Sequence, residues 1–204
     1  IISIPAAITI SRLMVPQAET PSSGELINPY NFSGSMDAIS QGASDGMKLY
    51  LNIIAMLIVT LALVALVNTI LECFPNIAGA PITLQRILGL MMSPVTWLMG
   101  ISWNEASIAG NLLGTKTVLN EVIAFIELAA LPKHLLSKHS DLIMVYALCG
   151  FANLSSIGIQ IGGLGTMAPE RRSEIIALGF KAVIAGTLSS CMSGTIVGIL
   201  YWVG

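Results

Sequence analysis

Long apolar runs separated by short polar segments dominate the chain. Residues 49–71 and 182–204 contain no Asp, Glu, Lys or Arg, and residues 142–169 form a third charge-free run. Each run is longer than the roughly 20 residues that cross the hydrocarbon core of a bilayer. The pattern therefore predicts an all-α polytopic membrane protein.

The third apolar run has a polar interruption at its centre. Asn153, Ser155 and Ser156 lie there, with Gly150 before them and Gly158 after them. Every backbone polar group in hydrocarbon must be satisfied, so such a break is tolerated where it is buried in protein or lines a cavity. Broken helices of this kind indicate the substrate site of a transporter. The alternative is a helix-packing face, because Gly and Ser also let membrane helices approach closely.

A second polar interruption divides another apolar region into two short arms. The arms cover residues 106–113 and 122–131, and the polar middle covers residues 114–121. Each arm is about half as long as a span of roughly 20 residues, which favours a re-entrant hairpin. A single spanning helix would bury Lys116 and Glu121 at a cost of about 2.5–3.5 kcal/mol each. Five residues apart, the two charges pair poorly on one helix face, so Glu121 is a functional candidate.

The remaining segments are assigned from their polarity. An interfacial helix is expected over residues 80–103, which are broken by Pro94 and carry Arg86, with a tilted full span as the alternative. Residues 16–47 are rich in Pro, Gly, Ser and acids and are expected to form an aqueous connecting loop, with room for a short helix near 36–47. The predicted order is the end of a transmembrane helix (1–15), an aqueous connecting loop (16–47), a scaffold transmembrane helix (48–72), an interfacial helix (80–103), a re-entrant hairpin (104–131), a broken transmembrane helix (141–167) and a final transmembrane helix (172–204).

Composition agrees with a membrane protein and excludes several other classes. Charged residues make up 10% of the chain, against about 25% in soluble domains. No basic cluster exceeds Arg171-Arg172, which argues against a nucleic-acid partner. The three cysteines show no CxxC spacing, and His134 and His139 are expected to be solvated loop residues, so no metal site is predicted. Residues 1–11 lack the basic region of a signal peptide and are interpreted as part of a longer protein.

The polar groups expected at membrane depth indicate a binding site and not an enzyme. They comprise a carboxylate, amides and hydroxyls, without a nucleophile and base pair. A carboxylate accepts hydrogen bonds from two hydroxyl groups at once, so the set suits a ligand with vicinal hydroxyls. A transporter for a small polar or polyhydroxylated solute is predicted, with a channel as the alternative. The groups are Asn120, Glu121, Asn153, Ser155 and Ser156.

Two motifs carry a resemblance to a known family. The sequence GTKTVLNEVIA at residues 114–124 resembles the G-x-K-x-x-x-N-E-F-V-A signature of the concentrative nucleoside transporters. The sequence ALCGFANLSSI at residues 147–157, followed by APERR at residues 168–172, resembles their second signature. The chain departs from the first signature at Val122, where Phe is usual. The whole chain is similar to the C-terminal half of that family.

The resemblance implies a fold and an activity. The fold is an inverted-repeat transporter with a re-entrant helical hairpin and an unwound transmembrane helix, and residues 1–15 would close the first repeat. The activity is nucleoside symport driven by a Na⁺ or H⁺ gradient, by alternating access of a mobile transport domain against a scaffold in an elevator mechanism. A homotrimer in the lipid bilayer of a bacterial plasma (inner) membrane is implied, with no organic cofactor.

The resemblance also implies roles for individual residues. Glu121 would bind the ribose, Asn153 and Ser156 would supply an amide and a hydroxyl to it, and Phe151 would lie beside the substrate. Asn120 precedes the ribose-binding acid in the same motif and belongs to the same site. The base-recognising residues and the cation site are expected in an N-terminal half that this chain lacks, so the chain would supply the ribose-binding half of the site.

Overall fold

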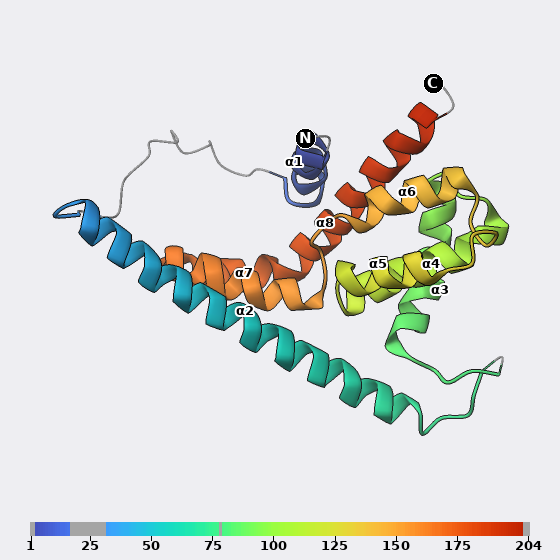
Figure 1. The fold of residues 1–204 in the computed structure, drawn as a ribbon, viewed down its shortest axis with the longest axis horizontal. Helices are drawn as coiled ribbons and strands as arrows, with labels where there is room; N and C mark the ends of the chain where they lie inside the picture. The colour runs from blue at the N-terminus through green and yellow to red at the C-terminus, as the bar shows by residue number, and fades with distance from the viewer. Residues whose placement is uncertain (1–2, 17–31, 78, 202–204) are drawn as a thin grey trace.

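The computed structural model describes residues 3–16, 32–77 and 79–201, and these fold into helices without a β-strand (Figure 1). The short antiparallel bridge between Ile77 and Ala80 is an isolated pair in a loop. The all-α prediction is therefore confirmed for the described residues. The helices are α1 (Ser3–Met14), α2 (Ser35–Leu71), α3 (Leu84–Leu98), α4 (Trp103–Val118), α5 (Glu121–Ala130), α6 (Lys138–Leu148), α7 (Leu154–Met167), the 3₁₀-helix η1 (Pro169–Arg171) and α8 (Arg172–Tyr201).

Helix α2 is longer than its apolar sequence suggests. The helix expected near residues 36–47 is present, but it is not a separate element within a loop, because it continues into the apolar span as one helix, α2. The backbone N–H and the hydroxyl of Ser33 both donate to Asp37 at the start of the helix, each at 3.0 Å. Asp45 accepts from Gln41 and Lys48 one turn away on either side. Such (i, i+3) and (i, i+4) pairs stabilise an exposed helix that lacks an apolar face. Residues 17–31 of the predicted loop lie outside the described residues.

Polar side chains fasten the end of α2 to the start of α3. The Asn68 side chain accepts from the backbone N–H of Leu84 at 2.9 Å and donates to Gln85 at 3.0 Å. The Arg86 guanidinium donates to the carbonyl groups of Ala80 and Pro81 at 2.7 and 2.6 Å. These bonds satisfy backbone N–H and carbonyl groups that have no hydrogen-bond partner within a helix.

Helices α3 and α4 approach closely through glycines. A β-carbon on Gly110 would lie 2.5 Å from the carbonyl oxygen of Gly89. A β-carbon on Gly114 would lie 2.6 Å from the backbone nitrogen of Gly89. Gly110 and Gly114 form a G-x-x-x-G pair, the spacing that allows membrane helices to pack backbone to backbone. Pro94 does not break α3, contrary to the sequence interpretation. Ser and Thr side chains and neighbouring helices make proline tolerable inside such helices.

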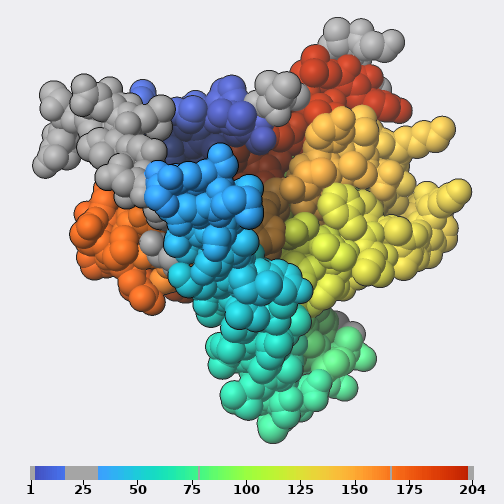
Figure 2. Space-filling model, turned by 60° about the vertical axis from the view of Figure 1, so that its left-hand side comes forward, coloured from blue at the N-terminus to red at the C-terminus, as the bar shows by residue number. Residues whose placement is uncertain are grey.

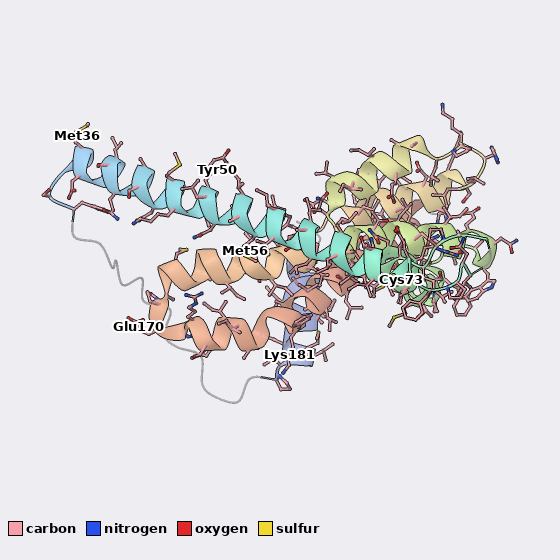
Figure 3. All side chains as sticks on the ribbon, turned by 90° about the horizontal axis from the view of Figure 1, so that it is seen from below. Met36, Tyr50, Met56, Cys73, Glu170 and Lys181 are labelled. Carbon is pink, nitrogen blue, oxygen red and sulfur yellow. The ribbon has the colours of Figure 1, made fainter. Side chains whose placement is uncertain are left out.

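Helix α7 lies alongside α2 and also packs on α8 (Figures 1 and 3). Gly158 and Gly162 face α2, and a β-carbon on Gly158 would collide with the side chain of Met56, which lies between the two helices in Figure 3. Gly162 faces Asn52 at ordinary contact distance. Beyond this contact, the end of α2 extends past α7 and meets the start of α3 through Asn68. This end of the molecule protrudes in Figure 2. The part of the chain that the structure describes therefore leaves most of the α2 surface exposed.

The buried core lies where α4, α6 and α8 meet. Leu113 of α4, Ile143 and Met144 of α6 and Cys191 of α8 are all buried there. His139 is half-buried in α6, with Nε2 3.0 Å from the carbonyl oxygen of Gly198 in α8. The expectation of a solvated loop histidine is therefore wrong at this position, because the helix begins before it at Lys138.

Two of the described helices are long and apolar enough to cross a membrane by length and composition, namely α2 and the continuous segment Pro169–Tyr201. Helix α1 and residues Leu154–Gly165 are apolar but shorter. Helix α3 has 15 residues and is about 22 Å long at 1.5 Å per residue. That length falls short of a hydrocarbon core of about 30 Å.

The packing of α3 on α4 gives a testable prediction. Replacing Gly110 by Leu should lower the free energy of unfolding by about 1–3 kcal/mol, because the side chain must force the helices apart. The measurement is the thermal unfolding midpoint of the detergent-purified protein. Gly42→Leu is the matched control, since no atom lies within 4 Å of a β-carbon there. Equal midpoints for the two variants would contradict the close-packed interface.

Candidate functional site

The turn between α4 and α5 is the first of two chain breaks that meet at the candidate site. Helix α4 continues through the polar middle of the predicted hairpin to Val118, and only Leu119 and Asn120 separate it from α5. The predicted polar tip is therefore mostly helical. The Asn120 side chain accepts from the backbone N–H of Ile123 at 2.9 Å and caps α5. This cap fixes Glu121 in the first turn of α5.

The second break separates α6 from α7 between Leu148 and Leu154. Asn153 caps α7, and its side chain accepts from the backbone N–H of Ser156 at 2.8 Å. The Ser156 hydroxyl in turn accepts from the backbone N–H of Asn153 at 3.2 Å and lies 2.6 Å from its carbonyl oxygen. This reciprocal capping box satisfies backbone groups that the break leaves open. Ser155 and Ser156 belong to the helix, so the break precedes them.

The two breaks are in direct contact. The Asn153 side-chain amide donates to the Glu121 carboxylate at 3.3 Å. Asn153 and Ser156 are buried, whereas Glu121 and Asn120 are half-buried and Phe151 is 52% exposed. The structure thus joins Glu121 to Asn153 and Asn153 to Ser156, with Asn120 next to Glu121 in the chain and Phe151 in the same break as Asn153.

The charges at the breaks match the polarity of the helices. Glu121 lies in the first turn of α5, and Asn153 presents its amide at the N-terminus of α7. Lys116 lies in the last turn of α4, and its ammonium donates at 2.8 Å to the carbonyl oxygen of Ala147 near the end of α6. Helix N-termini favour negative charge and C-termini favour positive charge.

Sequence reasoning missed the partner of Lys116. A salt bridge with Glu121 was the alternative considered from their spacing, but Lys116 forms no ion pair with it and donates to Ala147, 31 residues away. The sequence does show a lysine within an apolar region, and a lysine that is buried requires a hydrogen-bond or ion-pair partner. Spacing along the chain could not identify that partner.

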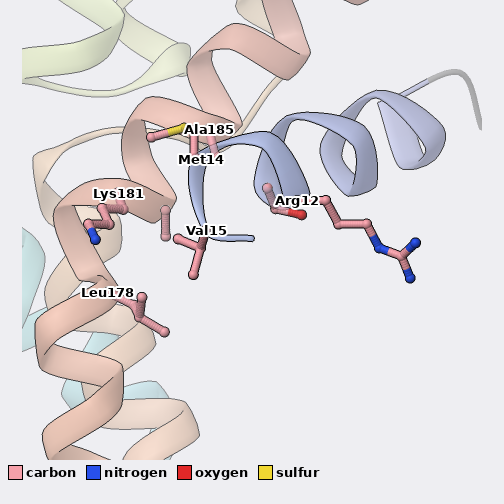
Figure 4. Close-up of a pocket in the computed structure, with 8 residues that line it drawn as sticks. Arg12, Met14, Val15, Leu178, Lys181 and Ala185 are labelled. Carbon is pink, nitrogen blue, oxygen red and sulfur yellow. The ribbon is translucent and has the colours of Figure 1, made fainter. Parts of the chain in front are cut away.

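The structure also has a buried hydroxyl group next to this cluster and a groove away from it. The Ser155 hydroxyl is buried and makes no hydrogen bond to the described residues. A separate groove of about 270 Å³ lies between α1 and α8 and shares no lining residue with the cluster (Figure 4). Arg12 and Lys181 border it, but the Arg12 guanidinium extends away from α8 (Figure 4). Among the described residues, no group of three His, Cys, Asp or Glu could hold a metal ion.

Comparisons with known proteins cover almost the whole chain. Residues 1–198 match the family model described as Na⁺ dependent nucleoside transporter C-terminus. An uncharacterized transporter of Haemophilus influenzae is 43% identical over 98% of this chain and 50% of its own length. The nucleoside permease NupC of Helicobacter pylori is 37% identical over 97% of this chain and 48% of its own length. The chain thus spans about half the length of these relatives.

Solved structures give the same result. A variant of CNTnw in its intermediate 2 state superposes with a TM-score of 0.81 and 38% identity, over 97% of this chain and 49% of that chain. CNTnw in an inward-facing substrate-bound state superposes with a TM-score of 0.74 and 38% identity, over 98% of this chain and 48% of that chain. The arrangement of helices in this chain therefore matches half of that protein.

The capping role of Asn153 can be tested separately from its contact with Glu121. Asn153→Ala should lower the free energy of unfolding by about 1–2 kcal/mol, because it removes the N-cap of α7. Asn153→Ser keeps a cap acceptor and should retain most of the stability, although it loses the amide that reaches Glu121. Thermal unfolding of the two purified variants in detergent gives the comparison. If both lose the same stability, the cap is not what Asn153 contributes.

Proposed function

This chain belongs to the Na⁺-dependent nucleoside transporter family, and on that premise we propose that it supplies the ribose-binding half of a nucleoside symporter. The family consists of transporters and not enzymes. The N-terminal half of the relatives, which has no counterpart in this chain, would complete the site. The assembly we propose is a homotrimer in the plasma membrane, as the family resemblance implies.

The contact between Glu121 and Asn153 is the observation that supports this proposal most directly. It places a carboxylate and an amide 3.3 Å apart at the junction of two broken helices. A carboxylate can accept hydrogen bonds from two hydroxyl groups, and an amide can both donate and accept. The pair therefore suits the vicinal 2′- and 3′-hydroxyls of ribose. A site built on such bonds rejects analogues that lack a hydroxyl, because its own polar groups would be left unpaired.

The other site residues have distinct proposed roles. Phe151 is exposed two residues before Asn153, and we propose that it contacts an apolar face of the nucleoside. Asn120 and Ser156 hydrogen-bond to the backbone at the starts of α5 and α7. We assign them the positioning of Glu121 and Asn153. Ser156 is fully buried, so direct contact with ribose would require its capping box to open.

Transport would be coupled to a cation gradient, and the family description favours Na⁺ as the co-transported ion. The two broken elements, α4–α5 and α6–α7, are joined at Glu121–Asn153 and at Lys116–Ala147. We propose that these elements move together against the long helix α2 and expose the site to each side in turn. The residues that select the base and hold the cation would lie in the other half.

The central test is uptake of radiolabelled uridine by the full-length transporter that contains this chain. Glu121→Gln should reduce uptake by at least tenfold. The neutral amide oxygen of Gln accepts hydrogen bonds from the ribose hydroxyls more weakly than the charged carboxylate of Glu does. In the wild type, 2′-deoxyuridine should compete more weakly than uridine. Surface expression and trimer assembly should be unchanged.

Glu127→Gln is the matched control, since Glu127 is exposed on the same helix. It should transport as the wild type does. Normal uptake by Glu121→Gln would remove Glu121 from the site. A wild type that takes up no nucleoside under either a Na⁺ or an H⁺ gradient would favour a transporter for another polar solute. Uptake that does not saturate would favour a channel.

A further inference from the structure

Lys116 is a fully buried cation that the ribose site does not use. Its side chain is 0% exposed, although it carries an ammonium group in the last turn of α4. A buried charge is costly unless it is paired or hydrogen-bonded. Its hydrogen bond to Ala147, at 2.8 Å, is therefore an arrangement that the surrounding structure must preserve.

The Ala147 carbonyl is an open group created by the second break. It lies in the last turn of α6, where no following helical N–H is available to it. The ammonium of Lys116 fills this position and also lies at the negative ends of two helices, α4 and α6. Both effects favour the charged lysine at this place over a neutral side chain.

Gly150 shows that the chain is tightly held directly after this carbonyl. A β-carbon at Gly150 would collide with the Ser190 hydroxyl of α8 and lie 3.2 Å from the Lys116 ammonium. The chain at Gly150 therefore packs closely against both Lys116 and Ser190. Phe151 and Asn153 follow within three residues. The close packing of Gly150 against Lys116 and Ser190, called the clamp below, therefore fixes the positions of Phe151 and Asn153.

We infer that Lys116 is a positioning residue that aligns the ribose-binding pair. It fixes the break between α6 and α7 to the end of α4, and the turn at Leu119 and Asn120 carries the same helix into Glu121. One side chain thus sets the spacing between Glu121 and Asn153 without touching the substrate. This inference rests on the proposed function, because it assigns Lys116 a role in nucleoside selectivity.

The test uses the purified full-length transporter with Lys116→Met, which keeps an unbranched apolar stem and removes the ammonium. Uridine, 2′-deoxyuridine and 3′-deoxyuridine are titrated by calorimetry. Lys116→Met should weaken uridine binding by at least tenfold and bring its affinity close to that of the deoxynucleosides. Lys133→Met is the control, because Lys133 is exposed in the loop before α6, and it should bind as the wild type does.

A second measurement needs no substrate. Backbone hydrogen exchange over residues 149–157 should be at least tenfold faster in Lys116→Met than in the wild type or Lys133→Met, because the clamp is lost. Unchanged exchange would overturn the inference. Faster exchange or fewer binding sites, with unchanged uridine affinity and selectivity, would also overturn it, since Lys116 would then be only structural.

The two proposals fail in different ways. A wild type that binds none of the three nucleosides would refute the proposed function and, with it, the role of Lys116 in selectivity. The exchange result would still decide whether Lys116 holds the break. Wild-type binding of uridine with no effect of Lys116→Met would leave the proposed function standing and reject the inference.

Discussion

The structure depends on satisfying the backbone groups that two chain breaks leave open in an apolar setting. The α4–α5 turn and the α6–α7 break together expose the last carbonyls of two helices and the first N–H groups of two others. Water cannot serve these groups within hydrocarbon. Asn120 and Asn153 cap the two N-termini, and Lys116 serves a carbonyl at a C-terminus. These side chains therefore stabilise both breaks.

The same arrangement places charged and polar side chains at the two breaks. Each helix start attracts a polar or negative group and each helix end attracts a positive one. The result separates an acidic, accessible side at Glu121 from a basic, buried side at Lys116. The proposed binding site and its internal support would therefore be consequences of one electrostatic arrangement. This explains why so few polar side chains suffice in a chain that is 54% hydrophobic.

The sequence predicted the all-α class because long charge-free runs are direct physical signals. It also indicated two interruptions, since Asn and Gly within an apolar run favour an interrupted helix over a continuous one. Their positions differ from the prediction, because the first lies at Leu119 and Asn120 and the second ends before Ser155. The roles of Glu121 and Asn153 came from the family resemblance, and their contact depends on tertiary structure. The hydrogen bond from Lys116 to Ala147 could not be predicted either, because it also depends on tertiary structure. A short helix near residues 36–47 was expected, but not its continuation into the apolar span, because polar pairs such as Asp45 with Lys48 leave no apolar pattern in the sequence.

The length of α2 has a consequence for its fit to the bilayer. Its 37 residues extend about 55 Å, and the charge-free part from Leu49 to Leu71 extends about 35 Å, slightly more than a hydrocarbon core of about 30 Å. This positive hydrophobic mismatch is relieved when the helix inclines from the membrane normal. Such an inclination would place Lys48 and Asp45 at the headgroups while the apolar stretch stays within the lipid. Changes in bilayer thickness would therefore be transmitted through α2 to α7, which packs along it.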